Sequence, residues 1–258
     1  MKPLSLYQER DTVIHKISAI SKIIYIFAAI FIPIILVSKL AGAIAILISI
    51  AILIKGRVLK KVIPLIALIA VVLLSVILIQ GLFRHGNKTV VLALGTIKFY
   101  KEGLYFAFGV CIRVINILLS FCVLILTTKP SDLVEALVRK GLSPRIGYVL
   151  ASVLQIIPQM SSAMGKITDA QRSRGMETEG KLLTRVKAFF PLLGPVVMDS
   201  LINTRERSMA LEVRGFNSSC KKTFLNEEKN YRYNLIINFV LLVSVVCALV
   251  WRGVQWLR

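Results

Sequence analysis

The sequence predicts an all-α integral membrane protein with about five transmembrane helices and long amphipathic helices in the cytoplasm. Three observations predict this fold class. Hydrophobic residues make up 56% of the 258 residues, above the roughly 45–50% typical of soluble domains. Several apolar runs are long enough to cross a bilayer core of about 30 Å. Between the last two of these runs lies a basic segment whose apolar residues recur at helical spacing.

Four apolar runs form an expected N-terminal membrane domain, residues 1–128, and a fifth forms the C-terminal part, residues 234–258. Each run approaches the length of about 20 residues that a helix needs to span a bilayer. We expect the spans at residues 21–37, 40–54, 62–83, 103–126 and 235–251. The connection between the first two spans, Ser38-Lys39, is the shortest and has the weakest local signal.

The distribution of basic residues predicts which parts of the chain face the cytoplasm. Residues 129–232 contain 17 of the 33 Lys and Arg residues. Because cytoplasmic loops carry the excess of positive charge, we expect the N-terminus and this long segment in the cytoplasm. The net charge of +20 then reflects membrane topology. Nucleic-acid binding is not favoured, since the basic residues flank apolar spans and no nucleic-acid-binding motif is present.

The expected cytoplasmic domain, residues 129–233, has the pattern of three helices near residues 130–141, 144–175 and 181–215. The first begins at Pro130, because proline in a first turn needs no amide partner. The second carries an apolar stripe from Ile146 to Ile167 with spacings of three and four residues. One proline inside the second helix and two inside the third are expected to kink them.

A short motif occurs twice, at the ends of the second and third of these helices. Residues 170–176 and 210–216 both read Ala-x-x-x-Arg-Gly-hydrophobe, 40 residues apart. One interpretation is helix capping, because glycine adopts the left-handed conformation at a helix end and a basic residue suits the dipole there. The other is docking, because arginine forks bind carboxylates. Two copies, each at the C-terminal end of a helix, favour binding to an acidic groove of a soluble partner.

The chain shows no pattern of catalytic, metal-binding or nucleotide-binding residues. All 13 Asp and Glu residues lie outside the expected spans, whereas proton-driven carriers use titratable groups inside the membrane. No Cys-x-x-Cys pair and no Gly-x-x-x-x-Gly-Lys-Ser/Thr loop is present. We therefore expect a non-enzymatic protein without a cofactor of its own. A membrane-bound enzyme and a self-contained carrier or channel are the alternatives.

One charged residue, Arg113, lies inside the fourth expected span. An unpaired charge at the bilayer centre costs at least about 2.5–3.5 kcal/mol on insertion scales. Arg113 is therefore expected to face the bundle or a polar partner such as Asn116. A structural helix–helix contact and a substrate contact are both open, and the structural role is favoured.

Several segments together resemble the transmembrane T components of energy-coupling factor transporters, the EcfT/CbiQ family. They are residues 14–16 with Lys22, residues 127–130, residues 155–158 and the two Arg-Gly motifs. The resemblance implies a multi-pass protein of a bacterial or archaeal cell membrane. Its implied partners are the lipid bilayer, two ABC-type ATPase subunits, which hold ATP and Mg²⁺, and a substrate-capture S component. Vitamins and transition-metal ions such as cobalt or nickel are both open as cargo.

The resemblance also implies roles for individual residues. In the family, each X-Arg-X unit docks into an ATPase subunit, and here the units correspond to Ser173-Arg174-Gly175 and Val213-Arg214-Gly215. Alanine usually precedes the arginine, so Ser173 and Val213 depart from the pattern. The remaining expected ATPase-coupling residues are Ala170, Arg172, Ala210 and Glu212. The expected S-component surface is Ile146, Leu150, Val153, Leu154, Ile157, Met160 and Met164.

Overall fold

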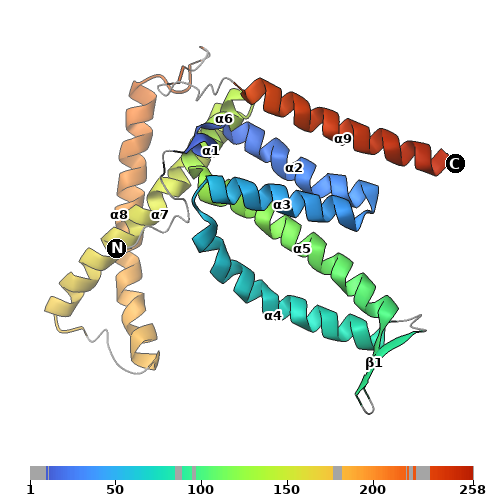
Figure 1. Ribbon diagram of the computed structural model, residues 1–258. Helices are drawn as coiled ribbons and strands as arrows, with labels where there is room; N and C mark the ends of the chain where they lie inside the picture. The colour runs from blue at the N-terminus through green and yellow to red at the C-terminus, as the bar shows by residue number, and fades with distance from the viewer. Residues whose placement is uncertain are drawn as a thin grey trace. The chain divides into compact units, whose positions relative to one another are not determined.

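The computed structural model describes residues 10, 12–84, 89–94, 97–176, 182–218, 220, 223–224 and 233–257. Its secondary structure is almost entirely helical, which confirms the predicted all-α class (Figure 1). The helices are α1 (Val13–Lys16), α2 (Ala19–Leu36), α3 (Lys39–Lys55), α4 (Leu59–Phe83), α5 (Lys101–Thr127), α6 (Pro130–Arg139), α7 (Pro144–Ser173), α8 (Leu182–Val213) and α9 (Asn234–Leu257). Two compact units divide within α6: α1 to α5 and α9 belong to one unit, and α7 and α8 belong to the other.

Five helices in the described part of the chain are long and apolar enough to cross a membrane. Four of them, α2, α4, α5 and α9, coincide with expected spans. The fifth is α7, which has the lowest hydropathy of the five. The helix at the remaining expected span is α3, whose 17 residues reach the lower limit of about 17 for crossing a bilayer core. The chain is thus a multi-pass membrane protein, and the assignment of α3 as a span and of α7 to the cytoplasm stays a prediction.

The membrane unit is organised around α5. Helices α2, α3 and α4 all pack against α5, and α9 packs against α2 (Figure 1). The most tightly packed core joins the end of α3, the start of α4 and the second half of α5. It consists of Leu53, Val58, Val62, Leu119, Cys122, Val123 and Leu126. Cys111 and Cys122 are free thiols buried in this unit, where they pack as small apolar residues.

Glycine allows α4 and α5 to approach each other closely at the other end of the unit. A Cβ atom built on Gly103, in the first turn of α5, would collide with the carbonyl oxygen of Gln80 in α4. The nearby Gly81 lies against Phe99 and Leu104. The α4–α5 pair is therefore held together by backbone contact that any larger residue at position 103 would disturb.

A two-stranded antiparallel hairpin connects these helices, and the sequence analysis did not predict it. Strand β1 (Val90–Leu94) pairs with β2 (Ile97–Tyr100). The Glu102 carboxylate secures the base of the hairpin by accepting hydrogen bonds from the Thr89 hydroxyl, at 2.7 Å, and from its amide, at 3.2 Å. Apolar and aromatic runs on both sides of a two-residue connection that begins with glycine are the signal that could have revealed it.

Candidate functional site

The first Arg-Gly motif forms the C-terminal cap of α7. Gly175 has a φ of +87°, in the left-handed region that glycine enters without steric cost. Its amide donates to the Arg172 carbonyl oxygen at 2.9 Å, and the Met176 amide donates to the Gln171 carbonyl oxygen at 3.1 Å. These two bonds define a Schellman motif, which satisfies carbonyl groups that the helix end leaves unpaired.

The second motif forms the same cap at the end of α8. Gly215 has a φ of +68°, its amide donates to the Glu212 carbonyl oxygen at 2.9 Å, and the Phe216 amide donates to the Leu211 carbonyl oxygen at 3.0 Å. The capping interpretation of the repeat therefore describes the backbone at both sites. It also places Arg174 and Arg214 at equivalent positions, each directly before the residue that ends its helix.

The two caps show the same pattern of half-buried and exposed residues. The four capping residues with an apolar or amide side chain, Gln171, Met176, Leu211 and Phe216, are half-buried. The residues expected to contact ATPase subunits are all exposed: Ala170, Arg172, Ser173, Arg174 and Gly175 on one side, and Ala210, Glu212, Val213, Arg214 and Gly215 on the other. The Ser173 hydroxyl donates to the Asp169 carbonyl oxygen at 3.1 Å, so it supports the last turn of α7.

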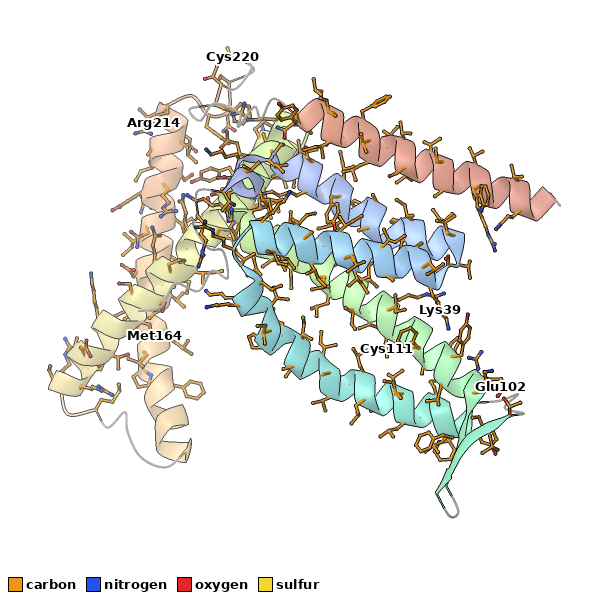
Figure 2. All side chains as sticks on the ribbon, in the orientation of Figure 1. Lys39, Glu102, Cys111, Met164, Arg214 and Cys220 are labelled. Carbon is orange, nitrogen blue, oxygen red and sulfur yellow. The ribbon has the colours of Figure 1, made fainter. Side chains whose placement is uncertain are left out.

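Helices α7 and α8 cross each other as an antiparallel pair (Figure 1). Near the start of α7, the Tyr148 ring lies 5.4 Å from the ring of Phe216, which follows α8. Further along, the Arg207 guanidinium donates to the Gln159 side-chain oxygen at 2.7 Å. Because the pair is antiparallel, the two capped ends lie at different ends of it. Figure 2 shows Arg214 at the end of α8 and Met164 in the opposite half of α7.

The apolar stripe of α7 is open to the surroundings in this chain. Ile146, Leu150, Val153, Leu154, Ile157 and Met160 are exposed by 37–52%, and Met164 is half-buried. Exposed apolar patches of this extent mark surfaces that contact another protein or lipid. Two apolar residues of α8, Leu192 and Val196, are by contrast buried.

A buried lysine connects α2 to the end of α5; from the sequence it was named only among the segments that carry the family resemblance. Lys22 is 5% exposed, and its Nζ donates to the Thr127 carbonyl oxygen at 2.9 Å and to the Thr128 hydroxyl at 3.3 Å. A cation at a helix C-terminus is favoured by the helix dipole. Lys22 thereby fixes the point where the chain leaves α5 for α6. A charged residue at the edge of an apolar run was the available signal.

Arg113 and Asn116, expected as possible partners inside the fourth span, are not brought together. Asn116 is buried, and its Nδ2 donates to the Ala29 carbonyl oxygen in α2 at 2.6 Å. Arg113 is exposed and lines a pocket with Lys39 and Arg84. Residues three apart are neighbours on a helix face, so the pair fails for a tertiary reason: the Asn116 amide donates across to α2, while Arg113 stays exposed.

Among the described residues, no group of three or more His, Cys, Asp or Glu side chains could hold a metal ion. The structural features that remain are the two capped arginine ends, the open stripe on α7 and the membrane unit around α5.

Residues 10–224, which include both capped ends, match the CbiQ family, described as cobalt transport protein. The chain is also similar to proteins named energy-coupling factor transporter transmembrane protein EcfT. The protein from Lactococcus lactis is 26% identical over 96% of this chain and 97% of its own length. Those from Exiguobacterium sibiricum and Leuconostoc gelidum are 29% and 30% identical, over 84% and 67% of this chain and 86% and 70% of their own lengths. The chain therefore belongs to the CbiQ family and is a transmembrane component of the energy-coupling factor transporter type.

Proposed function

We propose that this chain transmits ATP-driven motion of two ABC-type ATPase subunits to a membrane-embedded substrate-capture subunit. The observation that carries the proposal is the pair of matched helix ends. Each presents an exposed arginine directly before a glycine cap, and the two lie at different ends of one crossed helix pair. Two equivalent contacts on one crossed helix pair suit two equivalent partners.

The chemistry of the caps supports arginine as the docking group. A guanidinium presents a planar fork of donors that binds a carboxylate bidentately. The Schellman cap ends the helix immediately after each arginine, so no further helical turn shields the side chain from an approaching groove. Arg174 and Arg214 would each enter an acidic groove on one ATPase subunit.

The contacts between α7 and α8 support the transmission step. The Tyr148–Phe216 ring contact and the Arg207–Gln159 hydrogen bond join the pair at two levels. A displacement imposed on one capped end is therefore passed to the other helix rather than absorbed at a loose contact. Movements of packed helices as rigid bodies are a common way of coupling ATP binding to a distant site.

The open stripe of α7 is the proposed surface for the capture subunit. Its exposed aliphatic and methionine side chains can repack against different partners without specific hydrogen bonds. This assignment places α7 and α8 on the cytoplasmic side with the N-terminus. The polar residues Gln155, Gln159 and Lys166 within α7 support that placement over a position across the bilayer.

The proposal is tested with Arg174→Ala and Arg214→Ala, singly and together, in the chain expressed with its ATPase and capture subunits. Each lost contact to a charged groove is expected to cost about 1.5–3 kcal/mol, or roughly tenfold or more in affinity. The double variant should therefore lose ATPase subunits on purification and lose ATP-driven uptake.

The matched control is Arg145→Ala, which removes an exposed arginine from the first turn of α7. It should leave assembly and uptake intact. Assembly and transport that survive in the double variant would refute the proposed docking. The cargo is tested separately, by assaying uptake of a vitamin and of cobalt or nickel with each capture subunit that co-purifies.

A further inference from the structure

A positively charged pocket lies in the membrane unit, where α3 begins, α4 ends and α5 begins. It has a volume of about 430 Å³ and is lined by Lys39, Arg84, Glu102, Tyr105, Phe106, Val110 and Arg113. Three of these seven residues are cations and one is an anion. No residue of α7 or α8 lines it, so the proposed docking of ATPase subunits does not account for the pocket.

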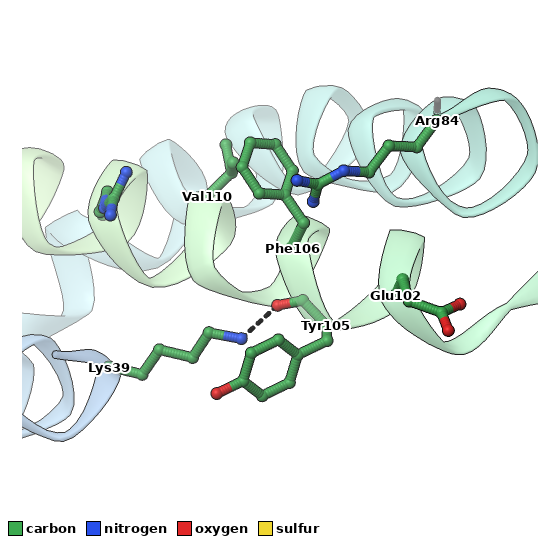
Figure 3. Close-up of a pocket in the computed structure, with 7 residues that line it drawn as sticks. Lys39, Arg84, Glu102, Tyr105, Phe106 and Val110 are labelled. Carbon is green, nitrogen blue, oxygen red and sulfur yellow. Dashed lines mark hydrogen bonds between the residues drawn. The ribbon is translucent and has the colours of Figure 1, made fainter. Parts of the chain in front are cut away.

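The side chains of the two outer cations are arranged over aromatic rings. The Arg84 guanidinium lies 3.6 Å from the centroid of the Phe106 ring. The Lys39 ammonium lies 2.7 Å from the centroid of the Tyr105 ring and also donates to the Tyr105 carbonyl oxygen (Figure 3). These contacts hold both charges beside α5, but they leave most of their hydrogen-bonding capacity for a ligand.

The single acid of the pocket is engaged in the hairpin. The Glu102 carboxylate accepts hydrogen bonds from the Thr89 amide and hydroxyl. Figure 3 shows this carboxylate directed away from the nitrogen atoms of Lys39 and Arg84. The pocket therefore presents an excess of positive charge to whatever enters it.

The third cation extends the pocket along α5. Arg113 follows Glu102 by 11 positions in the helix, about 16 Å at 1.5 Å per residue. It is exposed on the surface of a helix that is apolar enough to span a membrane. A charge at that depth is costly in lipid unless it has a polar partner. Between it and the outer cations, the lining is Phe106 and Val110.

We propose that this pocket binds an anionic phospholipid. The headgroup phosphate would bind Arg84 and Lys39, because guanidinium and ammonium groups are the usual phosphate ligands. The glycerol unit and the start of the acyl chains would lie along Phe106 and Val110, and the long Arg113 side chain would extend back toward the ester oxygens. A headgroup and glycerol unit suit a concave site whose volume falls within the usual 300–1,000 Å³.

The experiment titrates the purified full-length chain, in neutral detergent, with short-chain phosphatidylglycerol and with phosphatidylcholine, and reads the number of bound lipids by native mass spectrometry. The Arg84→Gln/Arg113→Gln double variant should bind phosphatidylglycerol about tenfold or more weakly, because two charge-assisted contacts are lost. Arg84→Lys/Arg113→Lys should restore a large part of the binding.

The matched control is Lys60→Gln/Lys61→Gln, which removes the same charge from exposed positions at the start of α4. It should stay within about twofold of the unmodified chain, since its charges are outside the pocket. An equal loss in this control, or equal binding of both lipids to the unmodified chain, would overturn the proposal. Displacement of the lipid by inorganic phosphate at similar concentration would identify a soluble anion as the ligand and would also overturn it. So would binding of phosphatidylglycerol that is unchanged in the Arg84→Gln/Arg113→Gln double variant.

Discussion

The packed core of the membrane unit and the crossed pair of α7 and α8 place the same kinds of side chain in opposite environments. In the membrane unit, Val123 is 2% exposed and Lys22 is 5% exposed with its ammonium hydrogen-bonded. In the crossed pair, Val153 is 49% exposed and Arg174 and Arg214 are exposed. A core that buries its apolar side chains and pairs its lysine is a stable base. A helix pair that exposes apolar and charged side chains is suited to binding partner proteins. Substitutions in the core should therefore change the stability of the chain, and substitutions in the helix pair should change its assembly with partners.

The largest effect on stability is expected from Lys22→Met. The substitution preserves the length of the side chain but removes the donor to the Thr127 carbonyl oxygen and the Thr128 hydroxyl. Hydrogen bonds to charged groups contribute about 1.5–3 kcal/mol each. Thermal unfolding of the purified chain in detergent should therefore shift down clearly.

The control for this prediction is Lys16→Met, because Lys16 is exposed at the end of α1. It should change the unfolding temperature little. If both variants unfold at the temperature of the unmodified chain, Lys22 does not secure the end of α5.

A somewhat smaller effect is expected from Gly103→Ala. The new methyl group would meet the Gln80 carbonyl oxygen and push α4 away from α5. Overpacking of this kind costs about 1–3 kcal/mol. Gly253→Ala, in α9, is the matched control, since nothing lies within 4 Å of a Cβ atom there. It should be neutral or slightly stabilising, because alanine favours helix, and a similar loss in both variants would contradict the close-approach argument.

The helical pattern of the fold could be predicted because it depends on local sequence. Apolar runs give the positions of α2, α4, α5 and α9, and glycine after arginine gives the ends of α7 and α8. Contacts between distant residues could not be predicted in the same way. Lys22 reaches residues more than 100 positions away, and Asn116 bonds Ala29 rather than a neighbour on its own helix. Helical periodicity indicates which face is apolar, but not which helix covers it.

The hairpin and the charged pocket show a second limit. Strands β1 and β2 are only five and four residues long, so their signal is weak beside that of the helices around them. The sequence shows Arg113 as a charge inside a span, but the other two cations of the pocket, Lys39 and Arg84, come from the start of α3 and the end of α4. Convergence of three helix ends is a tertiary property that no motif in one segment records.

A moderate, local effect is expected from Gly175→Ala and Gly215→Ala. Nothing lies within 4 Å of a Cβ atom at either position, so the cost is conformational and amounts to about 1–2 kcal/mol for a left-handed alanine. Hydrogen exchange at the Met176 and Phe216 amides, which donate in the caps, should become faster. Global unfolding should change less.

These glycine variants also sharpen the distinction between capping and docking. If the cap serves to present the arginine, Gly175→Ala should weaken co-purification of ATPase subunits, though less than Arg174→Ala does. Faster exchange at the cap with undiminished assembly would show that the arginine docks without help from the cap.

The smallest effect on stability is expected from Val153→Ser, because Val153 belongs to the open stripe of α7. Surface substitutions usually change stability by less than about 0.5 kcal/mol. The same substitution at Val123, in the packed core, creates a cavity and buries a hydroxyl, so it should cost about 2 kcal/mol or more. Unfolding in detergent measures both. Co-purification with the capture subunit should show the reverse order, with Val153→Ser weakening assembly while the chain itself stays folded. Equal losses of stability in the two variants would show that α7 is covered within the chain, and the contrast between a base and a partner surface would then be wrong.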